Sequence, residues 1–362
     1  MNGPFVLAAG GTGGHLFPAQ ALASELVRRG RRVVVMTDGR GHNYGKAFPG
    51  AEIATVPAAT FSGRSLLGRI LAMGVIALGV ASAFRKLLNL KPRVVVGFGG
   101  YPSLPVMLAA SLARVPSLLH EQNAVPGRVN RMLAGRVKAI AATFPFVRLA
   151  PRRAARIVFT GNPVRPEAQA LKGSAYTPPD ANGAIRILIF GGSQGARALS
   201  ELVPAALALL PQALRQRLEV TQQARADDVA MVEAAYRASG IKAEVNKFFG
   251  DLPTRMAASH LVVARSGAST LSELTVIGRP AILVPYPSAM DDHQSANAAV
   301  LEKAGAAWVV RQDTLDAAKL ARMLEDILND PETLRRHAEA AKALGHADAA
   351  ERLADLAEKI AS

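Results

Sequence analysis

The chain of 362 residues contains no cysteine, which excludes disulfides, thiolate nucleophiles and cysteine-bound zinc or iron–sulfur centres. Its seven histidines show no HExxH or similar pairing, so the sequence indicates no metal site. Aromatic residues make up only 5% of the chain and form no evident series for stacking on bases. The N-terminus lacks a basic region followed by a long apolar stretch. We therefore expect no signal peptide and a cytoplasmic location.

Acidic residues are scarce in the first part of the chain. Residues 1–165 contain 22 Lys and Arg against four Asp and Glu, a net charge of +18, whereas the remainder carries −3. This asymmetry predicts an anionic partner for the N-terminal half, either nucleic acid or an acidic membrane surface.

One hydrophobic segment, 70–84, contains no charge and is too short to span a membrane. We favour a buried crossover helix for it. The alternative is an apolar surface that rests on anionic lipid. Four basic residues border that surface: Arg64, Arg69, Arg85 and Lys86.

Two short apolar strands each lead into a glycine cluster and an alanine-rich helix. The clusters are GGTGGH at 10–15 and GGSQGA at 191–196. Glycines at such a bend let the backbone approach a bound group, and the helix that follows offers N–H donors to an anion. Packing of the helix on the sheet explains such glycines equally well. Neither cluster has the GxGxxG spacing of a dinucleotide site, and no Gly-Lys-Ser/Thr loop or DxD pair occurs.

Apolar runs without strict alternation recur in both halves, as expected for parallel strands buried on both faces. In the N-terminal half they are 5–9, 32–37, 93–97, 117–121 and 138–143; in the C-terminal half they are 185–190, 218–222, 244–248, 261–265, 281–285 and 307–310. The pattern predicts an α/β protein with two Rossmann-like parallel-sheet domains facing one cleft. We expect domains at 1–162 and 163–340, followed by a C-terminal helix at 341–362 that could pack back on the N-terminal domain.

Polar residues at the predicted strand ends are candidates for chemistry. His15 is either a packed residue of the helix N-terminus or a proton acceptor. Glu273, one turn inside a helix, either accepts two ribose hydroxyls or forms a capping box with Ser269 or Thr270; spacing alone favours the capping box. Glu121 ends an apolar strand, where side chains face the ligand crevice of an open sheet.

Seven motifs together make the chain similar to the MurG-type N-acetylglucosaminyltransferases. In order they are GGTGGHLFPA, GFGGYPS, HEQNAVPG, GNPVR, GGSQGAR, RSGASTLSE and DDHQSANA, between about residues 5 and 345. The resemblance implies the GT-B architecture. It also implies transfer of N-acetylglucosamine (GlcNAc), with inversion, from UDP-GlcNAc to the C4 hydroxyl of undecaprenyl-diphospho-MurNAc-pentapeptide. It implies a peripheral location on the cytoplasmic face of the inner membrane, an anionic membrane surface as partner, and no cofactor, metal or nucleic acid.

The resemblance also assigns site residues. Ser193 and Arg165 would contact the diphosphate region, Phe249 would bracket the uracil through its backbone, and Glu273 would hold the ribose. Gln294 and Asn123 would bind the GlcNAc, and His15 would be the general base. The full set implied for UDP-GlcNAc is Thr12, Gly13, Gly14, Asn123, Arg165, Ser193, Phe249, Ala268, Ser269, Thr270, Leu271, Ser272, Glu273 and Gln294.

Two other functions remain open on the sequence. A UDP-GlcNAc 2-epimerase could use the same fold, with Glu121 as the conspicuous carboxylate of the N-terminal half. A non-enzymatic nucleotide-sugar sensor or nucleic-acid binder could use the basic half.

Overall fold

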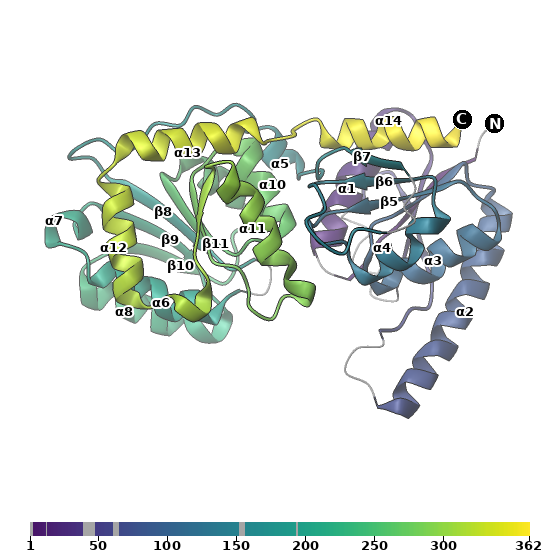
Figure 1. Cartoon of the computed structure of the whole chain (residues 1–362), viewed down its shortest axis with the longest axis horizontal. Coiled ribbons are helices and arrows are strands. Elements are labelled where there is room, and N and C mark those ends of the chain that lie inside the picture. The colour runs from purple at the N-terminus through teal and green to yellow at the C-terminus, as the bar shows by residue number, and fades with distance from the viewer. Residues whose placement is uncertain (1–2, 12, 39–47, 61–64, 152–155, 193–194) are drawn as a thin grey trace. The chain divides into compact units, whose positions relative to one another are not determined.

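The computed structural model of the chain describes residues 3–11, 13–38, 48–60, 65–151, 156–192 and 195–362. These residues form two compact units (Figure 1). Unit 1 comprises Met1–Arg165 together with His346–Ser362, and unit 2 comprises Pro166–Gly345. The chain therefore returns to unit 1 for its last helix.

Unit 1 contains a parallel sheet of seven described strands in the order β3-β2-β1-β4-β5-β6-β7. The strands are β1 (Phe5–Ala8), β2 (Val33–Thr37), β3 (Glu52–Thr55), β4 (Val94–Gly97), β5 (Ser117–Glu121), β6 (Ala139–Ala142) and β7 (Arg156–Phe159). Its helices are α1 (Gly13–Arg28), α2 (Leu66–Leu90), α3 (Gly100–Leu112), α4 (Arg128–Leu133) and α14 (Ala349–Ala361).

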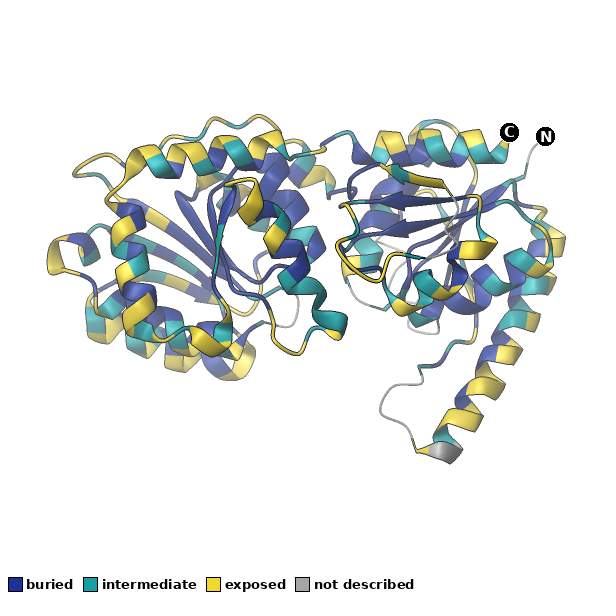
Figure 2. Ribbon diagram, in the orientation of Figure 1, coloured by how far each residue is buried: buried dark blue, intermediate teal, exposed yellow. Residues whose placement is uncertain are grey.

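The central strands of this sheet are buried because their side chains are apolar on both faces. Leu7 and Val96 pack on the side of α1 and α14, whereas Val6, Val95 and Met107 pack with α2 and α3. Figure 2 shows the result: buried strands lie between helices whose outer faces are exposed. The predicted doubly covered parallel sheet is confirmed.

Helix α2 corrects the expectation of a buried crossover helix. Its C-terminal half packs on α3: a Cβ at Gly79 would lie 3.1 Å from Cβ of Pro105 on that helix, and 2.1 Å from the carbonyl oxygen of Pro57. Its N-terminal half instead exposes large apolar side chains, including Leu71 at 61% and Leu78 at 67% (Figure 2). Among the described residues, 68–90 is a helix long and apolar enough to cross a membrane by length and composition, with 28% of its apolar window buried.

Unit 2 contains a parallel sheet of six described strands in the order β10-β9-β8-β11-β12-β13. The strands are β8 (Ile185–Phe190), β9 (Leu218–Gln223), β10 (Lys242–Asn246), β11 (Leu261–Ala264), β12 (Ala281–Leu283) and β13 (Ala307–Val309). The helices are α5 (Pro166–Gln169), α6 (Arg197–Ala208), α7 (Gln212–Arg215), α8 (Val229–Ser239), α9 (Leu252–Ala258), α10 (Ala268–Ile277), α11 (His293–Lys303), α12 (Ala317–Leu328) and α13 (Pro331–Ala343). Alternate residues of β8, such as Ile187 and Ile189, join the core formed with α6, α8 and α12.

Candidate active site

The strand order of unit 1 reverses direction between β1 and β4, because β2 follows β1 on one side and β4 pairs with it on the other. Loops that leave such neighbours diverge, and ligands of open α/β sheets bind in the crevice between them. The β1–α1 loop carries the first glycine cluster, and the β4–α3 loop carries Gly99 and Gly100. Gly10 is required by packing, since a Cβ there would lie 2.8 Å from Cβ of Pro102.

His15 lies in the first turn of α1 and faces the second of these loops. Gly100, with φ +71°, is so close that a Cβ on it would lie 3.2 Å from Cδ2 and 3.3 Å from Nε2 of His15. The imidazole Nδ1 is 3.3 Å from Oε1 of Gln122, the first residue after β5. The structure thus places the predicted base at the switch point of the sheet, between glycine backbone and a buried amide.

A buried polar chain continues behind Gln122. Its Nε2 is 3.0 Å from the carbonyl oxygen of Phe98, 3.0 Å from Nδ1 of His120 and 3.3 Å from the His120 carbonyl oxygen. The Nε2 atom of His120 is 3.2 Å from the carbonyl oxygen of Gly161. Complete burial lowers the pKa of His120 to about 4, so its imidazole is neutral at pH 7.

Glu121 does not face a ligand space as the sequence led us to expect. Its side chain is 1% exposed and accepts four hydrogen bonds within its own loop. Oε1 accepts from the backbone N–H and Nδ2 of Asn123, at 3.0 and 3.3 Å, and Oε2 accepts from Gly127 N at 2.9 Å and Asn130 Nδ2 at 2.7 Å. Glu121 therefore braces the 121–130 loop and orients Asn123, one of the residues assigned to the sugar.

The sheet of unit 2 reverses between β8 and β11. The loop after β11 leads into α10, whose N-cap is Gly267 and has no side-chain cap hydrogen bond. The expected capping box of Glu273 with Ser269 or Thr270 is therefore wrong, because neither residue is the N-cap. The Ser269 hydroxyl oxygen is buried and, among the described residues, has no hydrogen-bond partner. An uncapped helix N-terminus with such a hydroxyl beside it is suited to an anion.

Within α10, the predicted donor-site residues differ in whether their side chains can contact a ligand. Leu271 is fully buried, and Ser272 donates its hydroxyl to the Ala268 carbonyl oxygen at 2.8 Å. These two residues support the helix rather than present side chains. Glu273 is only 5% exposed, one turn behind the half-buried Thr270.

Gln294, at the start of α11, is tied to the same helix end. Its backbone carbonyl oxygen accepts the Ser266 hydroxyl at 2.8 Å, and Asn297 Nδ2 donates to the Ser266 carbonyl oxygen at 3.2 Å. The side-chain Oε1 of Gln294 accepts the backbone N–H of Tyr286 at 2.9 Å. This contact fixes the orientation of the amide, so its NH₂ group is the end that can donate to a ligand.

The loop after β10 carries two neighbouring phenylalanines with opposite environments. The Phe249 ring is buried beneath the Arg255 guanidinium, whose carbon lies 4.4 Å from the ring centroid. Only the backbone of Phe249 is then placed to form hydrogen bonds with a base, as the resemblance implies. Phe248 instead exposes 70% of its side chain at the carboxyl end of the strand. Sequence analysis missed this ring, although an aromatic residue after a parallel strand was a usable signal.

Five further predicted residues belong to the same set. Arg165 is half-buried in unit 1, with its guanidinium carbon 5.2 Å from the centroid of the Phe17 ring on α1. Thr12 and Ser193 lie outside the described residues. Gly13 and Gly14 form the first residues of α1, where helical N–H groups have no intrahelical partner. Among the described residues, no three His, Asp or Glu side chains gather as metal ligands.

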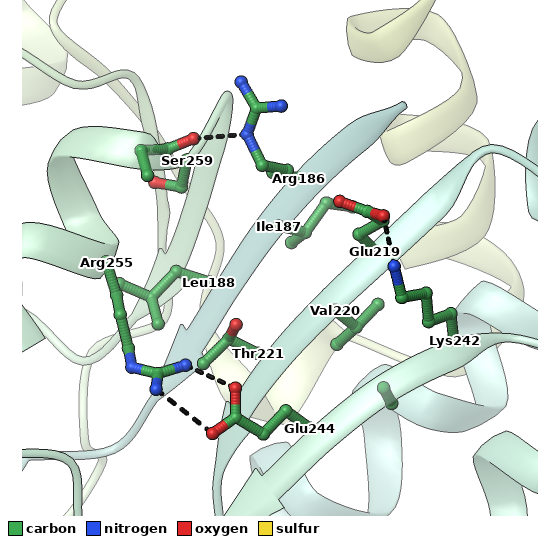
Figure 3. A pocket seen from close by; sticks show the side chains of 12 residues that line it. Arg186, Ile187, Leu188, Glu219, Val220, Thr221, Lys242, Glu244, Arg255 and Ser259 are labelled. Atoms are coloured by element: carbon green, nitrogen blue, oxygen red, sulfur yellow. Dashed lines mark hydrogen bonds and ion pairs between the residues drawn. The ribbon is translucent and has the colours of Figure 1, made fainter. Parts of the chain in front are cut away.

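A pocket of 320 Å³ lies elsewhere, along the amino-terminal halves of β8, β9 and β10 (Figure 3). Four of its five charged side chains pair with one another: Glu219 with Lys242 at 2.6 Å, and Glu244 with Arg255. Because ligands of such sheets bind at the carboxyl ends of strands, we assign no part of the active site to this pocket.

Two parallel sheets, each with polar and glycine-rich loops at its switch point, define a two-domain α/β protein of the nucleotide-sugar transferase type. The glycosyltransferase family 28 N-terminal domain matches residues 5–142, and the family 28 C-terminal domain matches residues 186–353. A protein of Methylobacterium sp. (strain 4-46) is 55% identical over 97% of this chain and 95% of its own length. A protein of Brucella canis is 51% identical over 100% of this chain and 95% of its own length. Both are named UDP-N-acetylglucosamine--N-acetylmuramyl-(pentapeptide) pyrophosphoryl-undecaprenol N-acetylglucosamine transferase.

Solved structures agree with these matches. The crystal structure of Acinetobacter baumannii MurG is 31% identical, with a TM-score of 0.81 and 99% of each chain covered. The chain therefore belongs to the MurG family of glycosyltransferases, and the predicted fold and enzyme class are confirmed. A UDP-GlcNAc 2-epimerase from Neisseria meningitidis has a TM-score of 0.65 at 14% identity, over 98% of this chain and 100% of its own, which shows a shared fold alone.

Proposed function

We propose that the protein transfers GlcNAc from UDP-GlcNAc to undecaprenyl-diphospho-MurNAc-pentapeptide, in the synthesis of peptidoglycan. The observation that carries this function is identity of 50–55% along essentially the whole chain to proteins named for that reaction. The matched length spans both units and therefore covers the loops at both switch points. The test is transfer of labelled GlcNAc onto a short-chain lipid-linked acceptor analogue. Absence of a transfer product from folded protein would refute it.

The epimerase alternative is tested in the same experiment by omitting the acceptor. An epimerase needs a group that removes the proton from C2 of the sugar. The engagement of Glu121 by four hydrogen bonds speaks against that role. We expect UDP-GlcNAc alone to remain unchanged, and conversion to a 2-epimer would favour the alternative.

The donor is assigned to unit 2. In this proposal the N-terminus of α10 and the Ser269 hydroxyl bind the diphosphate, Glu273 accepts the ribose hydroxyls, and the Gln294 NH₂ group donates to the sugar. The backbone of Phe249 forms hydrogen bonds with the uracil, and the exposed Phe248 ring is suited to stack on it. Replacement of Glu273 by Ala should mainly raise KM for UDP-GlcNAc; an unchanged KM would remove Glu273 from the ribose site.

The reaction is a direct displacement. The acceptor C4 oxygen forms a bond to the anomeric carbon of GlcNAc, the bond from that carbon to the diphosphate oxygen breaks, and UDP leaves with the electron pair. His15 accepts the proton of the attacking hydroxyl, a role worth on the order of 10²–10⁴ in rate. Near-normal turnover of a His15→Ala variant would exclude this role.

We further propose that unit 1 docks on the anionic cytoplasmic face of the inner membrane as a peripheral protein. The N-terminal half of α2 exposes Ile70, Leu71, Met73 and Leu78 at 56–67%. Residues 1–165 carry a net charge of +18, with the exposed Arg69 on the same helix. On such a surface, insertion of apolar side chains and attraction to anionic headgroups both contribute to the free energy of membrane binding.

Vesicle flotation tests this docking. We expect binding to vesicles that contain anionic lipid, weakened by salt, and little binding to zwitterionic vesicles. A triple Leu71→Ser, Met73→Ser and Leu78→Ser variant should lower the bound fraction on the order of tenfold or more, because three apolar contacts are lost. The matched control is Leu209→Ser, which changes a leucine of unit 2 that is 60% exposed. Equal binding by the triple variant and the control would refute docking through α2.

A further inference from the structure

The amide of Gln122 has only one orientation that satisfies its neighbours. Two carbonyl oxygens, those of Phe98 and His120, lie 3.0 and 3.3 Å from one end of the amide. Carbonyl oxygens accept hydrogen bonds only, so this end must be the NH₂ group. The opposite end, Oε1, is then the atom 3.3 Å from Nδ1 of His15.

His120 adds a third constraint in the same direction. Its Nε2 faces the Gly161 carbonyl oxygen at 3.2 Å and must therefore carry the ring proton. Because His120 is completely buried, its pKa is lowered to about 4 and the neutral ring holds a single proton. Its Nδ1 consequently accepts a hydrogen bond from Gln122 Nε2, which again directs Gln122 Oε1 toward His15.

An amide oxygen can only accept, so the His15 nitrogen that faces it must donate. We infer that Gln122 is a positioning residue that holds neutral His15 in the Nδ1–H tautomer and so makes Nε2 the basic nitrogen of the ring. Nε2 lies on the ring edge beside Gly100, where the absence of a side chain leaves that edge uncrowded by residue 100. The inference rests on the proposed function for its catalytic meaning, although the tautomer itself is a property of the protein alone.

Two substitutions at Gln122 separate positioning from simple packing. Gln122→Glu keeps an oxygen toward His15 but loses the NH₂ donors toward Phe98 and His120. Gln122→Met keeps the length of the side chain and loses both the oxygen and the donors. A structural role would make the two variants alike, since both lose the same buried donors. Positioning predicts that only Gln122→Met moves the His15 proton away from Nδ1.

The first readout is the ¹⁵N spectrum of histidine-labelled protein, with the His15 signals assigned by their loss in a His15→Asn variant. We expect Nδ1–H in the wild type and in Gln122→Glu, and a shift toward Nε2–H in Gln122→Met. The second readout is GlcNAc transfer, where Gln122→Met should lower kcat on the order of 10²-fold with little change in KM for UDP-GlcNAc. Gln122→Glu should keep the proton on Nδ1 but lower kcat at neutral pH, with recovery as the pH rises, because a carboxylate beside His15 stabilises the imidazolium.

Leu119→Ala is the control for lost stability, because Leu119 is a fully buried apolar residue of the same strand and belongs to no part of the polar chain. It should leave the His15 tautomer unchanged. An Nε2–H tautomer in the wild type, or the same tautomer and kcat in both Gln122 variants, would overturn the inference. The wild-type spectrum decides even if Gln122→Met fails to fold. Absence of transfer by the wild type would instead overturn the proposed function and leave the tautomer result standing.

Discussion

Replacement of Glu121 by Gln is the sharpest test of how the polar loop of unit 1 is held. Each carboxylate oxygen of Glu121 accepts two hydrogen bonds, one from a backbone N–H group (of Asn123 or Gly127) and one from a side-chain NH₂ group (of Asn123 or Asn130). The backbone N–H groups cannot act as acceptors. Either orientation of a glutamine amide sets an NH₂ group against two of these donors. At least one backbone hydrogen bond is therefore lost, and the other hydrogen bonds lose their charged acceptor, in a site that is 1% exposed.

A hydrogen bond to a charged group contributes about 1.5–3 kcal/mol, so we expect Glu121→Gln to lower the free energy of unfolding of unit 1 by about 3 kcal/mol or more. The matched control is Glu52→Gln, the same chemical change in the same unit. Glu52 is 56% exposed and pairs with Arg32 at 2.7 Å, which predicts a loss of about 0–1 kcal/mol.

The assay is hydrogen exchange rather than tryptophan fluorescence, because the only tryptophan, Trp308, lies in β13 of unit 2. The reporters are the amides of Lys138 and Thr143, which donate to the carbonyl oxygens of Ser117 and Glu121 between β6 and β5. Their protection should fall on the order of 10²-fold in Glu121→Gln and by less than about tenfold in the control. Equal protection in the two variants would refute the reasoning.

Three further predictions concern unit 1. The pKa of His120 is about 4 in the folded protein and near 6.5 in the unfolded chain, so the unfolded state binds more protons between these values. The free energy of unfolding should therefore be highest above pH 6.5 and lower by about 2 kcal/mol at pH 5. A free energy of opening of the β5 amides that does not change with pH would contradict this. Gly100→Ala should lower kcat, because the new methyl group would contact His15. The control is Gly30→Ala: Gly30 has φ +72° and no atom within 4 Å of its Cβ position, so this variant carries the same backbone strain but should keep kcat. Equal kcat values in the two variants would refute the effect of the contact. Arg29→Ala removes ion pairs to two carboxylates of α14, so the free energy of opening measured by exchange of α14 amides should fall by about 1 kcal/mol. Arg352→Ala, which removes a pair within that helix region, should have a smaller effect; identical exchange in the two variants would exclude a docking role for Arg29.

The sequence predicted the central strands well because those strands are apolar on both faces and therefore appear as continuous runs. It missed β3 and β7, the two edges of the first sheet, because their residues are mostly exposed or half-buried and form no such run. For α2, a run of apolar residues looked the same whether a helix was buried or exposed. Only the contacts at Gly79 and the exposed Leu71 and Leu78 distinguish its two halves.

The candidate site was predictable as a set of strand-end motifs but not as a set of contacts. The switch points placed His15 and the start of α10 where sequence analysis expected a ligand. The partner of His15 could not be predicted, since Gln122 is 107 residues away and its orientation depends on two backbone carbonyl groups. The capping box at Glu273 failed for a related reason: its spacing fitted, but the N-cap of the helix is Gly267, which has no side chain.

The scarcity of acidic residues in residues 1–165 narrows the chemistry that unit 1 can perform. Each of the four carboxylates there has a structural partner: Glu25 pairs with neighbouring arginines, Asp38 accepts from a tyrosine hydroxyl, Glu52 pairs with an arginine, and Glu121 braces its loop. A proton acceptor in this part of the chain therefore falls to a histidine, and among the residues that the structure describes His15 is the histidine at the switch point. A neutral amide beside it fixes the proton on one nitrogen without adding negative charge, where a carboxylate would repel a diphosphate and hold the imidazolium. The same choice of uncharged groups at the strand ends, with positive charge elsewhere, suits the proposed docking of unit 1 on anionic lipid.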